Sequence, residues 1–296
     1  MATRPAPAAA TPTTELSGLL LVDKPAGITS HDVVSHVRRA TGIKRVGHAG
    51  TLDPFATGLL VVLLGRGTRL IPYIDGEPKV YDAVIRLGSE TDTDDLTGVT
   101  THTDEPPADA DIARAIEQLT GPIEQYPPAF SAKQVGGVRA YAAARRGAPL
   151  DLQPSRVTVH EWRVGERDGE LLPARITCSG GTYIRALARD LGRLAGSAAH
   201  LASLRRVASG PFTVDDAVTL EDLDSARFTV RPLLEAIPQL PVQSIDSAEV
   251  VRTAHGNTIA ARADGARVAI VHDGVLAAIA VRDDDGLHPK VVLIDQ

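Results

Sequence analysis

Apolar residues in this chain are gathered into short runs that have the length of β-strands. Leu16 to Val22 and Leu59 to Leu64 are two such runs, and no run approaches the ~20 residues that a membrane-spanning helix needs. Elsewhere apolar residues recur at helical spacing, as they do from Asp111 to Thr120. A chain of 296 residues, 43% of them hydrophobic, is long enough to bury a sizeable core. We therefore expect a soluble α/β protein of one large domain or two.

Turn and cap residues set the bounds of the expected elements. Ser30 is a candidate N-cap, because a serine hydroxyl accepts hydrogen bonds from the free N–H groups at a helix start. Gly42 suits the left-handed residue just past the end of that helix. The sequence predicts strands at residues 16–22, 59–64, 80–87 and 175–178, and helices at 30–41, 111–120 and 184–194.

The two ends of the chain differ in character from the middle. Residues 1–15 are rich in proline, alanine and threonine and are expected to form a disordered tail. Prolines cluster near Pro238 to Pro241, so we place a domain boundary there and divide the rest into 16–237 and 238–296. In the second part, two runs of β-forming residues flank Asp273-Gly274, which predicts a hairpin over 267–282, and a further strand is expected at Val291 to Ile294.

The net charge of −6 argues against a nucleic-acid partner, but the charge is unevenly distributed. Six basic and two acidic residues give +4 from His31 to Leu70, and five arginines and one aspartate give +4 from Gly180 to Gly210. Ten acids and one arginine give −9 from Gly88 to Gln125. Local basic surface is what neutralises phosphates, so binding of nucleic acid stays possible. The alternative is that these arginines lie on ordinary solvated helix faces.

The sequence contains no pattern typical of a metal or cofactor site. Cys178 is the single cysteine, which excludes an internal disulfide and a cysteine zinc cage. The nine histidines lack zinc-ligand spacing, and Asp92 to Gly98 departs from a calcium-binding loop at Leu96 and Thr97. No phosphate-binding or dinucleotide motif occurs either. We expect neither a metal nor an organic cofactor.

The segment Gly47 to Gly58 (G-H-A-G-T-L-D-P-F-A-T-G) is the most unusual stretch of the chain. Its glycines allow a ligand to approach the backbone closely, and Pro54 stiffens the peptide directly after Asp53. Such a loop would hold a carboxylate at the rim of a cleft. The alternative is an ordinary turn, because aspartate before proline commonly starts one, and the residues alone favour that alternative.

This segment, continued by Leu59-Leu60, resembles the catalytic motif of the TruB family of tRNA pseudouridine synthases. Further stretches resemble the family's other motifs in the expected order, and together they cover about Leu16 to Phe212. These stretches are D-K-P-x-G at Asp23 to Gly27, the block from Tyr81 through Arg86-Leu87-Gly88 to Asp94, G-T-Y-I-R at Gly181 to Arg185, and A-H-x-x-x-L-R-R at Ala199 to Arg206.

The resemblance implies the pseudouridine-synthase fold, an α/β (α+β) architecture with a mixed, mostly antiparallel sheet and flanking helices. It also implies a small C-terminal PUA-like RNA-binding β domain, although the charge of −3 from Leu240 onward departs from that of an RNA-binding module. The implied activity converts uridine to pseudouridine in the T-loop of tRNA (TΨC, position 55), by a flipped-out base and without a cofactor. The implied partner is the T stem-loop of tRNA, and a cytoplasmic monomer is expected.

The resemblance also assigns roles to individual residues. Asp53 matches the nucleophile or electrostatic stabiliser at C1′, Arg185 matches its basic partner, and Tyr81 matches the tyrosine that stacks on the base and takes the C5 proton. The substrate-binding residues are expected to be His48, Tyr183, Leu204 and Lys24. Four of these residues have a structural alternative: Arg185 could lie on an exposed helix face with Arg189, Tyr81 and Leu204 could be packing residues, and His48 could be a solvated loop histidine.

Two rival functions stay open at this point. One is a non-catalytic RNA-binding or RNA-chaperone protein that uses the same cleft, and it predicts that loss of Asp53 has no effect. The other is a related pseudouridine synthase with a different target, such as ribosomal RNA.

Overall fold

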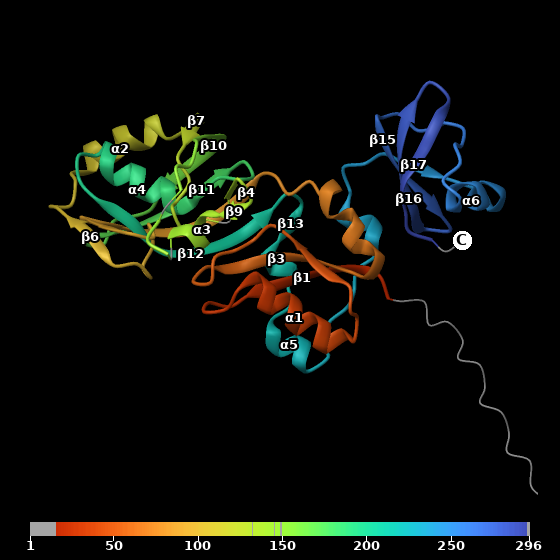
Figure 1. Ribbon diagram of the computed structural model, residues 1–296, viewed down its shortest axis with the longest axis horizontal. Helices are drawn as coiled ribbons and strands as arrows, with labels where there is room; N and C mark the ends of the chain where they lie inside the picture. Colours follow the sequence, from red (N-terminus) through yellow and green to blue (C-terminus); the bar gives the residue numbers. More distant parts are fainter. Residues whose placement is uncertain (1–15, 132, 145, 149, 295–296) are drawn as a thin grey trace, which may run out of the picture.

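The computed structural model of the chain describes residues 16–131, 133–144, 146–148 and 150–294 (Figure 1). The expected disordered tail, residues 1–15, lies outside the described residues. The chain forms a mixed α/β fold with two main sheets. None of the helices in the described ranges combines the length and the apolar character needed to cross a membrane.

The larger sheet contains nine strands, and its main path runs β1-β3-β12-β4-β11-β10-β7, with β2 beside β3 and β13 beside β12. The pairing of β3 with β12 is parallel and the others are antiparallel, which confirms the expected mixed, mostly antiparallel sheet. Its strands are β1 (Gly18–Lys24), β2 (Val46–Ala49), β3 (Thr57–Leu64), β4 (Lys79–Leu87), β7 (Gly121–Gln125), β10 (Ser155–Val164), β11 (Leu171–Cys178), β12 (Ala199–Ser209) and β13 (Phe212–Thr213).

Two groups of helices pack on this sheet (Figure 1). Helices α1 (Ser30–Thr41) and α5 (Leu220–Asp224) lie together near β1 and β3, and Val33 and Val37 of α1 share a core with Leu60 of β3. Helices α2 (Asp109–Gln118) and α4 (Ile184–Leu194) lie together over the other half of the sheet, where Leu187 packs in one core with Ile85. The apolar faces predicted from helical spacing are the faces that these cores bury.

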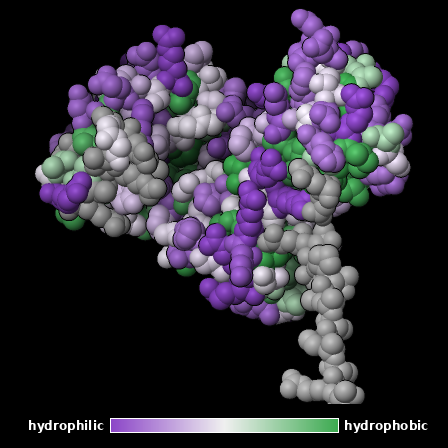
Figure 2. Space-filling view, turned by 45° about the vertical axis from the view of Figure 1, so that its right-hand side comes forward, coloured by the Kyte–Doolittle hydropathy of each residue, from purple (hydrophilic) through white to green (hydrophobic). Residues whose placement is uncertain are grey.

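The smaller sheet, ordered β14-β15-β16-β17, forms the C-terminal unit of the chain, residues 242–292. Its elements are β14 (Val242–Ser244), α6 (Ser247–Ala254), β15 (Arg267–His272), β16 (Val275–Asp283) and β17 (Gly286–Val292). In the space-filling view this unit is the upper right-hand lobe, where hydrophobic patches lie among hydrophilic residues (Figure 2). Leu63 and Leu70 share a core with Ala269 and Ile279, and Arg66 donates to the carbonyl of Leu293 at 2.9 Å, so the unit packs on the larger sheet.

Short elements connect these parts. They are η1 (Gly65–Tyr73), β5 (Ser89–Thr91), β6 (Thr100–Thr103), β8 (Gln134–Val135), β9 (Val138–Arg139), α3 (Ala140–Ala144), η2 (Val214–Asp216) and η3 (Leu233–Ala236).

The predicted N-cap of the first helix was wrong by one residue. The N-cap is Thr29, whose hydroxyl accepts from Asp32 N at 3.1 Å, while the Asp32 carboxylate accepts from Thr29 N at 2.9 Å. The Ser30 hydroxyl instead turns inward, where it donates to Leu52 O and accepts from Leu52 N. The predicted end is confirmed, because Gly42 is left-handed with φ 72°.

The predicted hairpin over 267–282 is confirmed. His272 pairs with Val275, and Asp273 and Gly274 between them both have positive φ, as the turn type requires. The expected strand at Val291 to Ile294 was misplaced, since β17 begins at Gly286 and ends at Val292. In β17 the half-buried His288 and Pro289 and the exposed Lys290 separate the buried Leu287 from Val291, which obscures the apolar pattern of the strand in the sequence.

Candidate active site

The loop that follows β2 is fastened to its neighbours through its backbone. Pro54 O accepts from Gly27 N at 2.8 Å and from Lys24 Nζ at 3.2 Å, and Ser30 holds Leu52 by two hydrogen bonds. Ala56 N donates to Asp53 O at 3.1 Å, which closes a turn by main-chain atoms. The Asp53 side chain is therefore not needed to make the turn.

The Asp53 carboxylate is directed at Arg185 in the first turn of α4. Arg185 Nε lies 2.9 Å from Asp53 Oδ2, and Arg185 Nη2 donates to Asp53 Oδ1 at 3.2 Å. The guanidinium also donates to the carbonyls of Thr93 and Phe130 at 2.8 and 2.9 Å. The Arg185 side chain is 5% exposed and that of Asp53 is 36% exposed, so a buried cation holds a carboxylate that faces open space.

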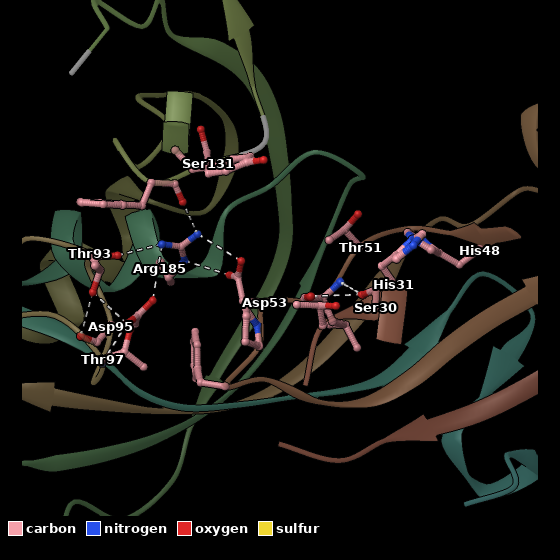
Figure 3. Close-up of a pocket in the computed structure, with 16 residues that line it drawn as sticks. Ser30, His31, His48, Thr51, Asp53, Thr93, Asp95, Thr97, Ser131 and Arg185 are labelled. Carbon is pink, nitrogen blue, oxygen red and sulfur yellow. Dashed lines mark hydrogen bonds and ion pairs between the residues drawn. The ribbon is translucent and has the colours of Figure 1, made fainter. Parts of the chain in front are cut away.

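A second carboxylate shares the same guanidinium. Asp95 Oδ2 lies 3.4 Å from Arg185 Nη1, and Asp95 Oδ1 accepts from Thr93 Oγ1 and Thr97 N at 2.8 and 2.9 Å. Figure 3 shows the two carboxylates pointing toward Arg185 from different sides. Asp95 is not among the expected site residues, although it directly follows the family motif that ends at Asp94.

Burial raises the pKa of the Asp53 carboxyl, the Arg185 guanidinium lowers it, and the nearby Asp95 carboxylate adds to the increase. The ionised form of Asp53 therefore depends on Arg185. An ionised carboxylate in this position can attack an electron-deficient carbon or stabilise positive charge on it.

Two cavities meet at Asp53 and Arg185. The larger, of about 730 Å³, is lined by residues that include His31, His48 and Ser131. The smaller, of about 240 Å³, is lined by the following residues: Thr51, Leu52, Asp53, Lys79, Tyr81, Ser131, Gly181, Thr182, Tyr183, Ile184, Arg185 and Leu204. Five of the seven expected site residues, Asp53, Tyr81, Tyr183, Arg185 and Leu204, thus line the smaller cavity.

Tyr81 forms an apolar wall of the smaller cavity and is 6% exposed. Burial raises the pKa of its phenol, and the adjacent Arg206 guanidinium opposes that increase. The hydroxyl therefore holds its proton at neutral pH. Tyr81 would accept a further proton only from a strongly acidic group that forms beside it during the reaction.

His48 lies apart from this cluster, on β2. It lines the larger cavity with His31 and Thr51, on the side away from Arg185 (Figure 3). Burial, and next the charge of Arg206, lower the pKa of His48, so its imidazole is neutral at pH 7. Its buried Nδ1 has no hydrogen-bond partner among the described residues, which leaves one polar atom free for a ligand.

Lys24 was expected to bind the substrate, but the structure places its side chain away from both cavities. Its side chain is fully buried and lines neither cavity. Its ammonium donates to the carbonyls of Pro25, Ile28 and Pro54 at 2.9, 2.8 and 3.2 Å, which uses all three N–H groups. Burial lowers the pKa of Lys24 to about 8. Lys24 thus joins the D-K-P loop to the loop that carries Asp53.

We expect Lys24→Met to lower thermal stability and the rate of the chemical step without weakening substrate binding. Three part-buried carbonyls lose their donor, and each buried group left unsatisfied costs about 1–3 kcal/mol. Thermal unfolding together with separate kcat and KM values would measure this. A higher KM with an unchanged kcat would contradict this prediction and would indicate that Lys24 binds the substrate.

Arg189 is buried, so the alternative of an exposed helix face that carries both Arg185 and Arg189 is wrong. Arg189 is 8% exposed, its Nη1 lies 2.8 Å from Asp94 Oδ2, and its Nη2 donates to Tyr126 O at 3.0 Å. Arg193 likewise pairs with Glu90 at 2.7 Å. The reason is that the acidic segment from Glu90 to Asp95 folds across α4 and presents a carboxylate to each successive turn.

The basic stretch from Gly180 to Gly210 is therefore not a free phosphate-binding surface. Its three helical arginines pair with the acidic segment, Arg205 pairs with Asp23 at 2.7 Å, and Arg206 is 1% exposed. Counting charges along the sequence could not show this compensation, because the paired residues lie from about 90 to 182 positions apart.

Within the described ranges, no group of three or more His, Cys, Asp and Glu side chains is placed to hold a metal ion. The main reactive group of the site is the Asp53 carboxylate, which lies at the junction of the two cavities. One of these cavities has an aromatic wall that suits a flat ring.

Comparisons with known proteins agree with this geometry. Residues 38–184 match the family model "TruB family pseudouridylate synthase (N terminal domain)", and residues 185–238 match "tRNA pseudouridylate synthase B C-terminal domain". The chain is 47% identical to tRNA pseudouridine synthase B of Thermobifida fusca (strain YX), covering 93% of this chain and 98% of that one. It is 43% identical to the protein of the same name from Arthrobacter sp. (strain FB24), covering 94% and 96%.

Solved structures show the same fold. The crystal structure of a Cbf5-Nop10-Gar1 complex contains a chain with a TM-score of 0.71 and 26% identity, covering 94% of this chain and 85% of that chain. A chain in an H/ACA RNP bound to a substrate RNA has a TM-score of 0.69 and 24% identity, covering 94% and 85%.

Proposed function

The chain belongs to the TruB family of pseudouridine synthases, and on this premise we propose that its site converts the uridine at position 55 of the tRNA T-loop to pseudouridine. The protein is an isomerase that acts on RNA. The observation that carries the assignment of the site is the Asp53–Arg185 pair, which lies where the two cavities meet.

The reaction moves the ribose from N1 to C5 of uracil. The C1′–N1 bond breaks with its electron pair on uracil, and the Asp53 carboxylate bonds to C1′ or stabilises the charge there. The base turns, C5 bonds to C1′ as the Asp53 oxygen departs, C5 loses its proton and N1 gains one. Arg185 keeps Asp53 ionised and oriented, and a guanidinium can do so without giving up its own proton.

The smaller cavity is the proposed place of the target base. A base that reacts in this way must leave the stack of the T-loop, at a cost of a few kcal/mol, and be held outside it. Tyr81 and Leu204 offer the apolar wall for the flat ring, and Tyr183 lies at the start of α4. The larger cavity, with His31 and His48, then faces the sugar and its neighbours.

We expect His48→Ala to reduce kcat/KM for tRNA by roughly tenfold, as expected for the loss of one hydrogen bond to a flipped nucleotide. The matched control is His160→Ala, because His160 is exposed on β10 and outside both cavities. A complete loss of activity in His48→Ala would contradict this division of roles and would place His48 in the chemical step.

We place a domain boundary at residue 238, with the synthase domain in 16–237 and a PUA-like unit in 238–296. A separate four-stranded sheet at 242–292 supports this division, and so does the second family match, which ends at residue 238. The unit shares a core with the synthase domain and carries a charge of −3 from Leu240 onward, which favours a structural role over a main role in neutralising phosphates.

The test is to incubate the purified protein with an unmodified tRNA transcript and to map pseudouridine at single-nucleotide resolution. The expected product is one pseudouridine, in the T-loop. Conversion of ribosomal RNA transcripts instead would favour the second rival, and tRNA binding without any pseudouridine would favour a non-catalytic RNA-binding protein.

A further inference from the structure

The smaller cavity contains a lysine that the roles above do not use. Lys79 and Tyr81 are two positions apart on β4, and side chains alternate along a strand, so both face the cavity. Arg206 on β12 lies directly opposite Tyr81, and Cys178 on β11 lies directly opposite Lys79. Directly opposed residues of antiparallel strands share a face, which makes these four residues one patch around the ring of Tyr81.

Neither cation of this patch forms an ion pair with a carboxylate of the described residues. The side chain of Lys79 forms no hydrogen bond or ion pair with any residue that the structure describes. Arg206 is 1% exposed, and in the described residues its guanidinium donates to the main-chain carbonyls of Leu59 and Gly50, at 2.8 and 3.1 Å, and to the neutral Tyr81 hydroxyl. Burying charge without a partner is costly, so two such groups side by side indicate that a ligand supplies the missing negative charge.

The charged ends of both side chains converge on the loop that carries Asp53. A Cβ atom added to Gly50 would lie 3.4 Å from Arg206 Nη1 and 3.7 Å from Lys79 Nζ. Burial and the charge of Arg206 lower the pKa of Lys79, whereas Glu77 and Cys178, the acidic groups that face it, oppose the decrease. The Cys178 thiol has a pKa of about 11 and is neutral, and Glu77 forms no ion pair with Lys79 in the described structure.

The cavity therefore has a charge gradient, with the Asp53 carboxylate at its junction with the larger cavity and uncompensated positive charge beside its aromatic wall. A reaction that breaks the C1′–N1 bond of uridine needs negative charge near the ribose carbon and positive charge near the base. When the C1′–N1 bond breaks, the ribose carbon becomes electron-deficient and uracil carries the electron pair as an anion, with charge on N1, O2 and O4.

We propose that Lys79 is a further catalytic residue, whose ammonium stabilises the uracil anion while the base is detached from the ribose, and that Arg206 adds to the positive field behind Tyr81. This inference rests on the proposed function. No proton needs to leave Lys79: the ammonium binds the anion until C5 attacks C1′, and the pair of electrons then forms the new C–C bond. Preorganised charge directed at a developing anion is among the largest catalytic contributions that side chains make.

The test compares Lys79→Met and Lys79→Arg with the unmodified full chain on two tRNA transcripts, one with uridine and one with 5-fluorouridine at the target position. Fluorine at C5 withdraws electrons and stabilises the uracil anion without any help from the protein. The measurement is the single-turnover rate at which the target nucleoside disappears, followed by chromatography of nuclease digests. Arg114→Met is the control, since Arg114 is an exposed cation that pairs with Asp111 on α2.

For Lys79→Met we expect a ~100-fold slower reaction of uridine, in line with the loss of one charge-stabilising donor. On 5-fluorouridine the loss is expected to be less than tenfold, and Lys79→Arg should stay within tenfold of the unmodified protein on both transcripts. An equal loss on both transcripts, or no loss on uridine, would overturn the proposal, because a merely structural role does not depend on the leaving base. If the unmodified protein converts neither transcript, the proposed function itself fails and this inference fails with it.

Discussion

Asp53→Asn is expected to leave no measurable pseudouridine formation while tRNA binding stays nearly unchanged. Asparagine keeps the shape of the side chain but cannot attack C1′ or stabilise positive charge there. Binding depends on phosphate contacts and stacking elsewhere, so the affinity for tRNA should vary by less than about threefold. The measurements are single-turnover conversion of a tRNA transcript at saturating enzyme and, separately, the dissociation constant of the complex.

The matched control for this change is Asp109→Asn. The Asp109 side chain is 86% exposed and pairs with Arg167 at 3.2 Å, so the same chemical change occurs in an ion pair on the surface. It should keep full activity. Turnover by purified Asp53→Asn above the background of a mock preparation would rule out Asp53 as the essential carboxylate and would favour a non-catalytic protein or another nucleophile.

Arg185→Met is expected to reduce the single-turnover rate by roughly 10²–10⁴-fold, since removing one partner of a buried ion pair costs about 3–5 kcal/mol. The change leaves two carboxylates, Asp53 and Asp95, facing each other without their shared cation. It also leaves the carbonyls of Thr93 and Phe130 without their donor. Arg185→Lys should restore only part of the rate, because an ammonium cannot form the forked contact of a guanidinium.

The pH dependence distinguishes loss of charge from loss of fold. Burial raises the pKa of Asp53 and Arg185 lowers it, and the active form is the ionised carboxylate. The acidic limb of the rate should therefore lie above the ordinary range of aspartate in the unmodified protein and move to still higher pH in Arg185→Met. An acidic limb that does not move would contradict the pairing.

The matched control for Arg185→Met is taken from outside α4, because the neighbouring Arg189 is itself buried and paired with Asp94. We use Arg163→Met, which removes an ion pair of similar length, 2.7 Å to Glu161, at a site where the two side chains are 71% and 48% exposed. Exposed pairs contribute roughly 0–1 kcal/mol, so this variant should retain full activity and thermal stability.

The sequence by itself determined the local elements and the residues that share a motif. Helical spacing located α1, α2 and α4, and the Asp273-Gly274 turn predicted the hairpin of β15 and β16. These features depend on residues a few positions apart, so the information is present in any short window of the chain. The family motifs likewise placed Asp53, Tyr81 and Arg185 among the candidates before any contact was known.

The tertiary structure alone decided which polar side chains are covered and what covers them. Periodicity identifies the apolar face of a helix, but whether Arg189 on its polar face meets water or Asp94 depends on a segment 95 residues away. Lys24, placed by motif among the substrate contacts, became a buried link between two loops. Lys79 and Arg206 became neighbours because β12 pairs with β4. Charge and burial at each of these sites come from contacts between distant segments, and only the assembled sheet brings those segments together.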